Sequence, residues 1–141
     1  MSVESFIDTN VFIYQLERQD ARKAAIAERL IQEGIAAGTA CISFQVVQEC
    51  LNVALRHAQQ PLTAEELRRY LVSVLAPLYR VQPGLRLYQS ALDLQDRYRF
   101  AFYDALIVAA ALEAGCARLY SEDLQHGQRI DGLTIENPFL A

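Results

Sequence analysis

Apolar and polar positions alternate along this chain in blocks that predict a regular succession of short strands and longer helices. Compact runs of apolar and β-branched residues are typical of buried strands, whereas an apolar residue every three or four positions is typical of helices. Strands are predicted over residues 3–8, 39–43, 78–82 and 117–121, with a further short strand over 133–136. Helices are predicted over residues 10–17, 20–37, 44–58, 63–75, 85–98 and 102–115.

Capping and turn residues mark the ends of several of these helices. Asn10 and Asp20 are suited to cap the helices that follow them, because short polar side chains accept hydrogen bonds from unpaired backbone N–H groups. Thr63 with Glu66 three positions later forms a capping box. Gly38 ends the helix over residues 20–37.

The order of the predicted elements indicates the fold class. Strands and helices alternate throughout, which predicts an α/β fold, a three-layer α/β/α sandwich with a central parallel sheet. The chain has 141 residues without an evident linker or repeat, so residues 1–141 are expected to form a single domain. In such folds ligands bind beyond the carboxyl ends of the strands, where the strand order reverses. Asp8 and Ser121 lie at two predicted strand ends.

Composition indicates the cellular location and the state of the cysteines. No stretch approaches the roughly 20 apolar residues that cross a bilayer, and the N-terminus lacks a signal-peptide pattern, so a cytoplasmic location is expected. Cys41, Cys50 and Cys116 are far apart among apolar neighbours, which predicts buried, reduced thiols. His57 and His126 are the only histidines, and a zinc site would need more closely spaced ligands.

Charge gives no general sign of nucleic-acid binding, because the formal net charge is −4. Twelve of the thirteen basic residues are nevertheless arginine, whose planar side chain suits phosphate. If the protein acts on nucleic acid, the attraction must therefore be local.

Four of the seventeen carboxylates stand in apolar segments rather than on charged faces: Asp8, Glu49, Asp104 and Asp123. Each has a structural explanation when it is taken singly. Asp8 and Asp104 suit a helix start, Asp123 suits a turn, and Glu49 suits the polar face of a helix that also carries Gln45, Gln48, Asn52 and Arg56.

Taken together, the four acids occupy strand ends and helix starts that one sheet could bring together. Grouped carboxylates raise one another's pKa values, and a divalent cation holds them ionised. Oxygen ligands without Cys or His suit Mg²⁺ or Mn²⁺. Metal-assisted cleavage of phosphodiesters is the chemistry that such a site favours.

Four segments of the chain, "FIDTNVFIY", "SFQVVQECLNV", "FYDALIVAAALEAGC" and "LYSEDLQHG", resemble the PIN-domain ribonucleases in order and spacing. The likeness is closest to the VapC-type toxins of bacterial toxin–antitoxin modules, and it covers nearly the whole chain. The "ENPF" tail is also similar to such toxins.

The resemblance implies roles for individual residues. Asp8, Glu49, Asp104 and Asp123 would bind Mg²⁺ or Mn²⁺ and carry catalysis, although Glu122 remains an alternative fourth acid. Thr9, Asn10 and Ser121 would support the site. Similar toxins commonly carry Ser or Thr where Ala101 stands, and losing this hydroxyl should remove supporting hydrogen bonds without abolishing metal binding.

The resemblance also implies the function and the partners. The hypothesis is a Mg²⁺- or Mn²⁺-dependent endoribonuclease, the toxin of a type II toxin–antitoxin pair, that leaves 5′-phosphate and 3′-hydroxyl ends. Similar toxins form homodimers and are inhibited by a protein antitoxin whose tail enters the acidic site. Candidate RNA contacts are Arg18, Arg22, Arg97, Arg99, Phe100, Phe102 and Tyr103, although core packing is the better explanation for at least two of the three aromatics.

The sequence allows two other interpretations. The alternative function is a non-catalytic α/β module that binds RNA or protein and uses its acids structurally. A phosphorylated receiver domain is disfavoured, because it would need a lysine late in the chain and Lys23 is the only lysine.

Overall fold

The computed structural model describes residues 3–56 and 62–140. Its strands are β1 (Ser5–Ile7), β2 (Ala40–Ser43), β3 (Tyr79–Val81), β4 (Arg118–Tyr120), β5 (Arg129–Ile130) and β6 (Leu133–Glu136). Its α-helices are α1 (Thr9–Glu17), α2 (Ala21–Ala37), α3 (Phe44–Arg56), α4 (Ala64–Tyr70), α5 (Ala76–Leu78), α6 (Leu85–Tyr98) and α7 (Phe102–Glu113). Of the sequence features discussed above, His57 and the last predicted residues of the helix over 44–58 lie outside the described part of the chain.

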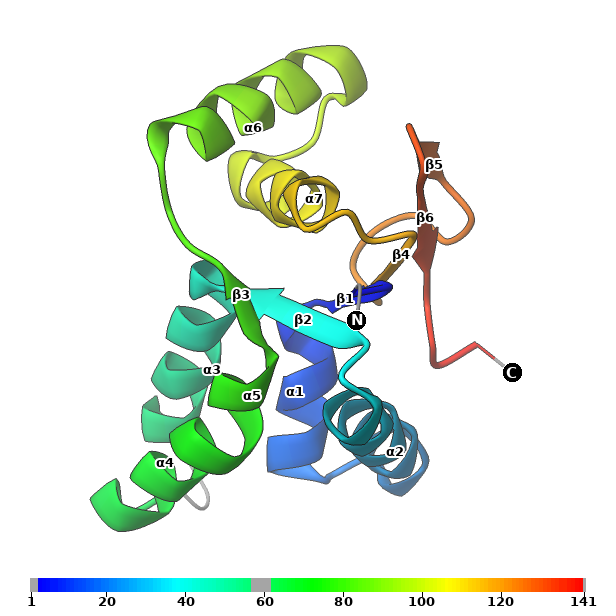
Figure 1. Cartoon of the computed structure of the whole chain (residues 1–141). Coiled ribbons are helices and arrows are strands. Elements are labelled where there is room, and N and C mark those ends of the chain that lie inside the picture. Colours follow the sequence, from blue (N-terminus) through cyan, green and yellow to red (C-terminus); the bar gives the residue numbers. More distant parts are fainter. Residues whose placement is uncertain (1–2, 57–61, 141) are drawn as a thin grey trace.

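The strands form one mixed, mostly parallel sheet in the order β3-β2-β1-β4-β6-β5. Helix α7 contacts β2 and β4 on one face and carries α6 on its outer side, while α1, α2 and α3 pack together on the other face (Figure 1). The predicted α/β/α sandwich is thereby confirmed.

Two elements differ from the sequence prediction. The predicted helix over residues 63–75 continues through a π-helical segment, Leu71–Leu75, into α5. The short strand β5 was not predicted, and it pairs antiparallel with β6 at the edge of the sheet. Two residues are too few to give a periodic pattern, so this strand depends on pairing with β6 for its definition.

Buried apolar side chains hold the layers together. Phe6 and Ile7 of the central strand β1 are both fully buried, as expected for a strand covered by helices on both faces. The three cysteines are buried and free, as predicted. Gly34 lets α2 lie close to β2, because a Cβ atom there would stand 2.5 Å from the Cβ of Ala40.

The strand order places the ends of β1 and β4 side by side. The chain passes from β1 to β2 on one side, and β4 later pairs with β1 on the other, so the order reverses between β1 and β4. Ile7 is in register with Tyr120, and the backbone N–H of Asp8 donates to the carbonyl of Tyr120 at 2.9 Å. Asp8 and Ser121, the next residues of the two strands, therefore emerge together at the reversal, where α/β proteins bind ligands.

The start of α1 corrects one detail of the sequence analysis. Asp8, not Asn10, is the N-cap, and its Oδ1 accepts from the backbone N–H of Thr9 at 2.7 Å. Because β1 passes into the helix at once, Asn10 falls within the first turn and its side chain is left to contact the end of β4.

Among the described residues, every helix is too short or too polar to span a membrane.

Candidate active site

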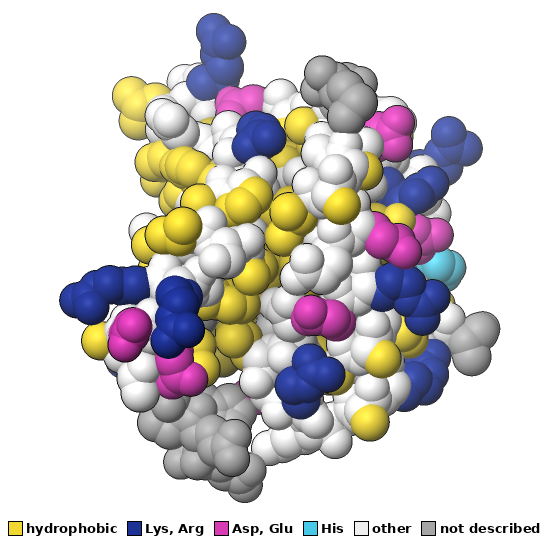
Figure 2. Space-filling model, turned by 60° about the horizontal axis from the view of Figure 1, so that its bottom comes forward, with side chains coloured by type: hydrophobic (Ala, Val, Ile, Leu, Met, Phe, Trp, Pro, Cys, Tyr) yellow, Lys and Arg dark blue, Asp and Glu magenta, His cyan; other side chains and the backbone are white. Residues whose placement is uncertain are grey.

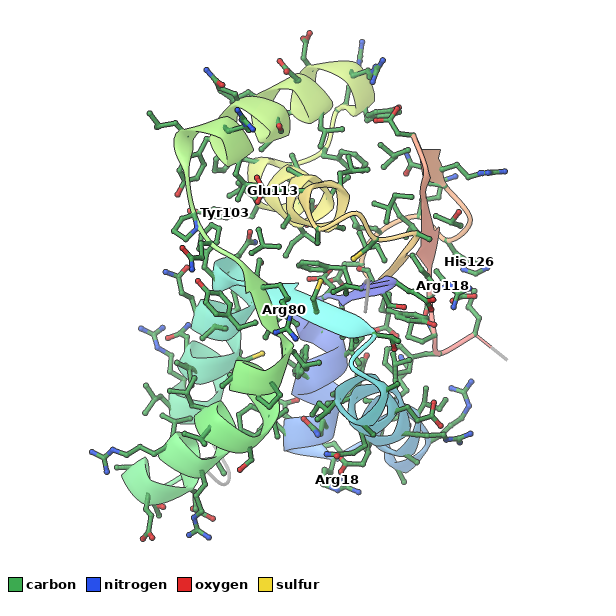
Figure 3. All side chains as sticks on the ribbon, viewed as in Figure 1. Arg18, Arg80, Tyr103, Glu113, Arg118 and His126 are labelled. Atoms are coloured by element: carbon green, nitrogen blue, oxygen red, sulfur yellow. The ribbon has the colours of Figure 1, made fainter. Side chains whose placement is uncertain are left out.

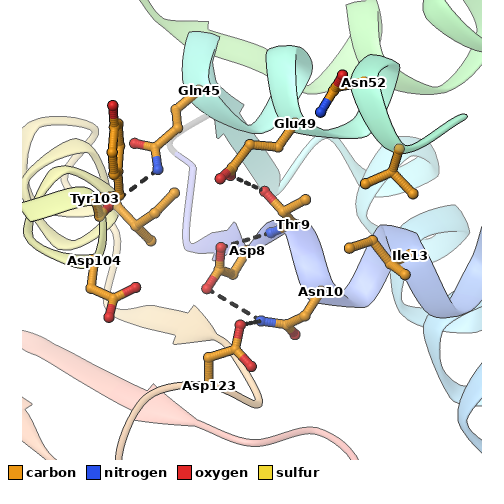
Figure 4. Close-up of a pocket in the computed structure, with 12 residues that line it drawn as sticks. Asp8, Thr9, Asn10, Ile13, Gln45, Glu49, Asn52, Tyr103, Asp104 and Asp123 are labelled. Carbon is orange, nitrogen blue, oxygen red and sulfur yellow. Dashed lines mark hydrogen bonds between the residues drawn. The ribbon is translucent and has the colours of Figure 1, made fainter. Parts of the chain in front are cut away.

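A pocket of about 290 Å³ opens where β1 and β4 end (Figure 4). The chain segments that line it come from the β1–α1 junction, α3, the start of α7 and the loop after β4. The four acids singled out from the sequence, Asp8, Glu49, Asp104 and Asp123, all line it. Thr9 and Asn10 line it as well, and the buried Ser121 donates a hydrogen bond to Asp8.

Asp8 is the most buried of these acids, with 6% of its surface exposed. Its Oδ2 accepts from the Ser121 hydroxyl at 2.8 Å and from the Asn10 amide at 3.3 Å. Its pKa is raised to about 7, mainly by burial; the hydrogen bonds from Ser121 and Thr9 lower the pKa, and the charges of Asp123 and Glu49 raise it. Near neutral pH this position therefore favours a proton or a cation beside the carboxylate.

Asn10 links the three polar residues of the β1 and β4 ends. Its Nδ2 lies 3.3 Å from Ser121 Oγ and 3.2 Å from Asp123 Oδ2, in addition to its contact with Asp8. Its Oδ1 accepts from the backbone N–H of Glu122 at 3.1 Å. The amide therefore stands between the carboxylates of Asp8 and Asp123 and sets their separation.

Thr9 orients a carboxylate of α3 in the same way as Asn10 orients Asp8 and Asp123. Its hydroxyl donates to Glu49 Oε1 at 2.6 Å, which turns this carboxylate toward the β1 end of the pocket (Figure 4). Glu49 lies on the polar face of α3, and this face lines the pocket.

Asp104 stands in the first turn of α7 and is partly buried. Burial raises its pKa, and the charge of Asp123 adds to this effect. Asp123 therefore interacts electrostatically with both Asp8 and Asp104, so three of the acids form a connected group, with Glu49 coupled to it through Asp8.

The structure separates the two neighbouring acids after β4. Asp123 lines the pocket, whereas Glu122 points away and pairs with Lys23 and Tyr14. Burial opposes ionisation of Glu122, but the hydrogen bonds from Lys23 and Tyr14 outweigh it and lower its pKa. Asp123 is thus the acid that this geometry makes available to a ligand.

The position of Ala101 shows what a hydroxyl group would do there. Ala101 is the N-cap of α7 and makes no side-chain capping bond. We expect Ala101→Ser to raise the free energy of unfolding by about 1 kcal/mol, because the hydroxyl can accept from a free N–H of the first turn. Urea denaturation would measure this. Ala101→Val, which adds bulk without an acceptor, should give no gain, and an equal gain in both variants would refute the capping role.

Gln45 and Asn52 also line the pocket, although the sequence indicates them only as parts of a polar helix face. They lie four residues before and three residues after Glu49, so helical spacing alone places all three on one face. The Gln45 amide donates to the backbone carbonyl of Tyr103 at 3.2 Å and ties α3 to α7.

The candidate RNA-contacting residues divide into two groups. Tyr103 lines the pocket with 68% of its surface exposed, whereas Phe100 and Phe102 pack against the core, as expected for two of the three aromatics. None of the four arginines, Arg18, Arg22, Arg97 and Arg99, lines the pocket. Figure 3 shows Arg18 at the far end of α1, well away from Tyr103.

The donor set of the pocket fits a hard divalent cation. Within residues 3–56 and 62–140 no three His, Cys, Asp or Glu side chains stand as a closed metal cage. Mg²⁺ does not need such a cage: it usually takes one or two carboxylates and keeps waters and phosphate oxygens as its other ligands. The raised pKa of buried Asp8 supports this fit.

The fold and this pocket define a small α/β/α protein with a polyacidic site at the strand-order reversal. A family model, the PIN domain, matches residues 5–131, and the chain belongs to the PIN-domain family. No curated protein sequence matches the chain.

Solved structures of toxin–antitoxin proteins share this fold. VapBC2 of Rickettsia felis, bound to a promoter DNA fragment, superposes with a TM-score of 0.69 at 17% identity, over 96% of this chain and 98% of the other. A toxin–antitoxin complex of Klebsiella pneumoniae gives 0.67 at 16% identity, again over 96% and 98%. VapC20 of Mycobacterium tuberculosis, described as a toxin that cleaves the sarcin–ricin loop, gives 0.61 at 20% identity, over 85% and 90%.

Proposed function

We propose that this chain is a Mg²⁺- or Mn²⁺-dependent endoribonuclease and the toxin of a toxin–antitoxin pair. The observation that carries the proposal is the convergence of four carboxylates, from four separate segments of a PIN-domain chain, on one pocket. The solved toxin structures with the same fold add support.

The residues of the pocket have distinct tasks in this mechanism. Asp8, Glu49, Asp104 and Asp123 line one pocket and would hold the cation, with Asp8 as a direct ligand. A bound Mg²⁺ or Mn²⁺ would supply a polarised water for attack on phosphorus and would stabilise charge on the leaving oxygen. Thr9, Asn10 and Ser121 orient the carboxylates through their hydrogen bonds.

Cleavage of total cellular RNA, with Mg²⁺ and with EDTA, tests the proposal. We expect cuts only with the metal and 5′-phosphate and 3′-hydroxyl ends, because the described residues that line the pocket include no histidine pair for a cyclic-phosphate route. Sequencing of the cut ends reads both the chemistry and the site preference. Cyclic-phosphate ends, or equal cleavage in EDTA, would contradict the proposal.

Tyr103 is the aromatic residue best placed to stack on a base of single-stranded RNA. We expect Tyr103→Ala to raise KM for RNA about tenfold, since one stacked base contributes about 1–3 kcal/mol. Tyr103→Phe keeps the ring and should keep the wild-type KM. Steady-state kinetics on a short cleaved RNA would measure both variants, and an unchanged KM in Tyr103→Ala would exclude the stacking role.

An exposed apolar groove supports a protein partner. It has a volume of about 320 Å³ and runs between α3 and the π-helical and α5 segments, lined by Phe44, Val47, Gln48, Leu71, Ala76 and Tyr79. Figure 2 shows hydrophobic side chains gathered on this lower face, with charged residues around them. Exposed apolar patches of this kind mark protein interaction sites, which agrees with an antitoxin and a homodimeric partner.

A further inference from the structure

A cluster of three side chains lies behind the loop that carries Asp123. Lys23 of α2, the only lysine of the chain, places its Nζ 2.5 Å from Glu122 Oε2 and 3.1 Å from the hydroxyl of Tyr14. The Tyr14 hydroxyl donates to the other carboxylate oxygen of Glu122 at 2.5 Å. Each of the three side chains therefore forms a hydrogen bond or ion pair with the other two.

Aromatic rings fix the lysine in place. Its Nζ lies 4.8 Å from the ring centroid of Tyr14 and 5.7 Å from that of Phe139, distances at which a cation is attracted to a ring face. The two rings meet edge to face at 4.9 Å, and Arg22 donates to the Phe139 carbonyl. Only about a quarter of each side chain of the Lys23–Glu122 pair is exposed, so the pair has little freedom to move.

Helix α1 connects this cluster to the pocket. Asn10 and Tyr14 are four residues apart and lie on the same face of α1. Asn10 accepts from the backbone N–H of Glu122, and Tyr14 donates to the side chain of Glu122. Glu122 is therefore held at both ends, and Asp123, the next residue, is left facing the pocket.

A partly exposed ion pair contributes little to the stability of a fold. The Lys23–Tyr14–Glu122 contacts have more effect on the geometry of the pocket. They hold Glu122 in place, and a movement of Glu122 would shift its backbone N–H, which orients Asn10. Asn10 in turn contacts both Asp8 and Asp123.

We propose that Lys23, Tyr14 and Glu122 form a positioning cluster that sets Asp123 and Asn10 for metal binding. This inference rests on the proposed function. Residues that orient metal ligands through hydrogen bonds typically affect metal affinity or activity by 10–100-fold when they are replaced.

The main test is Lys23→Met, which keeps most of the length of the side chain and removes its charge. We expect the Kd for Mn²⁺, measured by calorimetry with the metal alone, to rise about tenfold, and kcat to fall at least as much, with KM for RNA unchanged. In the metal-free protein, amide hydrogen exchange at Glu122 and Asp123 should accelerate. Lys23→Arg keeps the charge and should restore most of the affinity.

Arg29→Met is the matched control, because Arg29 is an exposed cation on the same helix, and it should behave as wild type. Tyr14→Phe removes only the hydroxyl and gives a second variant if Lys23→Met does not fold. Wild-type Mn²⁺ affinity and wild-type exchange at residues 122 and 123 in both cluster variants would overturn the inference. If the wild-type protein neither binds Mn²⁺ nor cleaves RNA, the proposed function fails, whereas the exchange measurement still decides whether the cluster positions the loop.

Discussion

Asp8→Asn is expected to reduce RNA cleavage by about a thousandfold and, at pH 8 without metal, to stabilise the fold. Metal polarisation contributes several kcal/mol to such reactions, and each 1.36 kcal/mol corresponds to a factor of ten in rate. Under the proposed mechanism Asp8 contacts the cation directly, so loss of its carboxylate should give a fall of about this size.

The gain in stability follows from the burial of Asp8. Its pKa rises from 3.8 to about 7 in the folded protein, and a shift of this size corresponds to at most about 4 kcal/mol against folding at high pH. Asparagine removes the charge but disturbs the hydrogen bond from Ser121, so we expect a net gain of about 2 kcal/mol. Urea denaturation and cleavage assays on the same preparations would measure the two effects.

Asp93→Asn is the matched control, because Asp93 is exposed on α6, away from the pocket. It should change neither activity nor stability appreciably. Full activity in Asp8→Asn would refute the assignment of Asp8 as a metal ligand, while a loss of activity together with a loss of stability would show a structural role.

The second large effect expected is the response of stability to pH and metal. Without metal, the free energy of unfolding should fall as the pH rises from 4 to 8. The folded protein binds a proton at Asp8 up to about pH 7, whereas the unfolded chain releases it near pH 4, so the folded state holds more protons throughout this window. Asp104, whose pKa is also raised, contributes in the same direction.

Comparison with Asp8→Asn isolates the contribution of one group. The stability advantage of the variant should be greatest at pH 8 and should be lost near pH 4, where Asp8 is protonated in the folded wild type and only about half ionised in the unfolded chain. An advantage that does not change with pH would contradict the assignment of the raised pKa to Asp8.

Mn²⁺ should offset the loss of stability that ionised Asp8 causes at pH 8. At a hundredfold excess over Kd, binding to the folded state contributes about 2.7 kcal/mol, which corresponds to a rise in Tm of roughly 10 °C for a chain of this size. Thermal unfolding with and without Mn²⁺ would measure the shift, and Asp8→Asn should reduce it. A non-catalytic module with structural acids would show no response, so this titration separates the proposed function from its alternative.

Local patterns in the sequence were sufficient for most of the fold. The apolar runs that become β1, β2 and β4 and the caps at Asp20 and Thr63 depend on residues close together in the chain, and they appear in the structure as predicted. Strand β5 and the continuation of the helix through Leu78 were missed, because each is defined by hydrogen bonds that a local pattern does not specify.

The same division holds for the site. The sequence singled out Asp8, Glu49, Asp104 and Asp123, because a carboxylate in an apolar segment is costly and needs a reason. It favoured Asp123 as the fourth acid but left Glu122 as an alternative, since both follow β4 and have the same charge. Their difference arises only when α2 brings Lys23 against the loop.

The succession of elements, the apolar core and the acids that stand out from it can be predicted from the sequence, because they follow from side-chain chemistry and short-range periodicity. The tertiary structure alone decided that β4 lies beside β1, that Asn10 spans Asp8 and Asp123, and that Glu122 turns away from the pocket. These features depend on contacts between residues roughly a hundred positions apart, and the packing of the whole sheet, rather than any local preference, selects them.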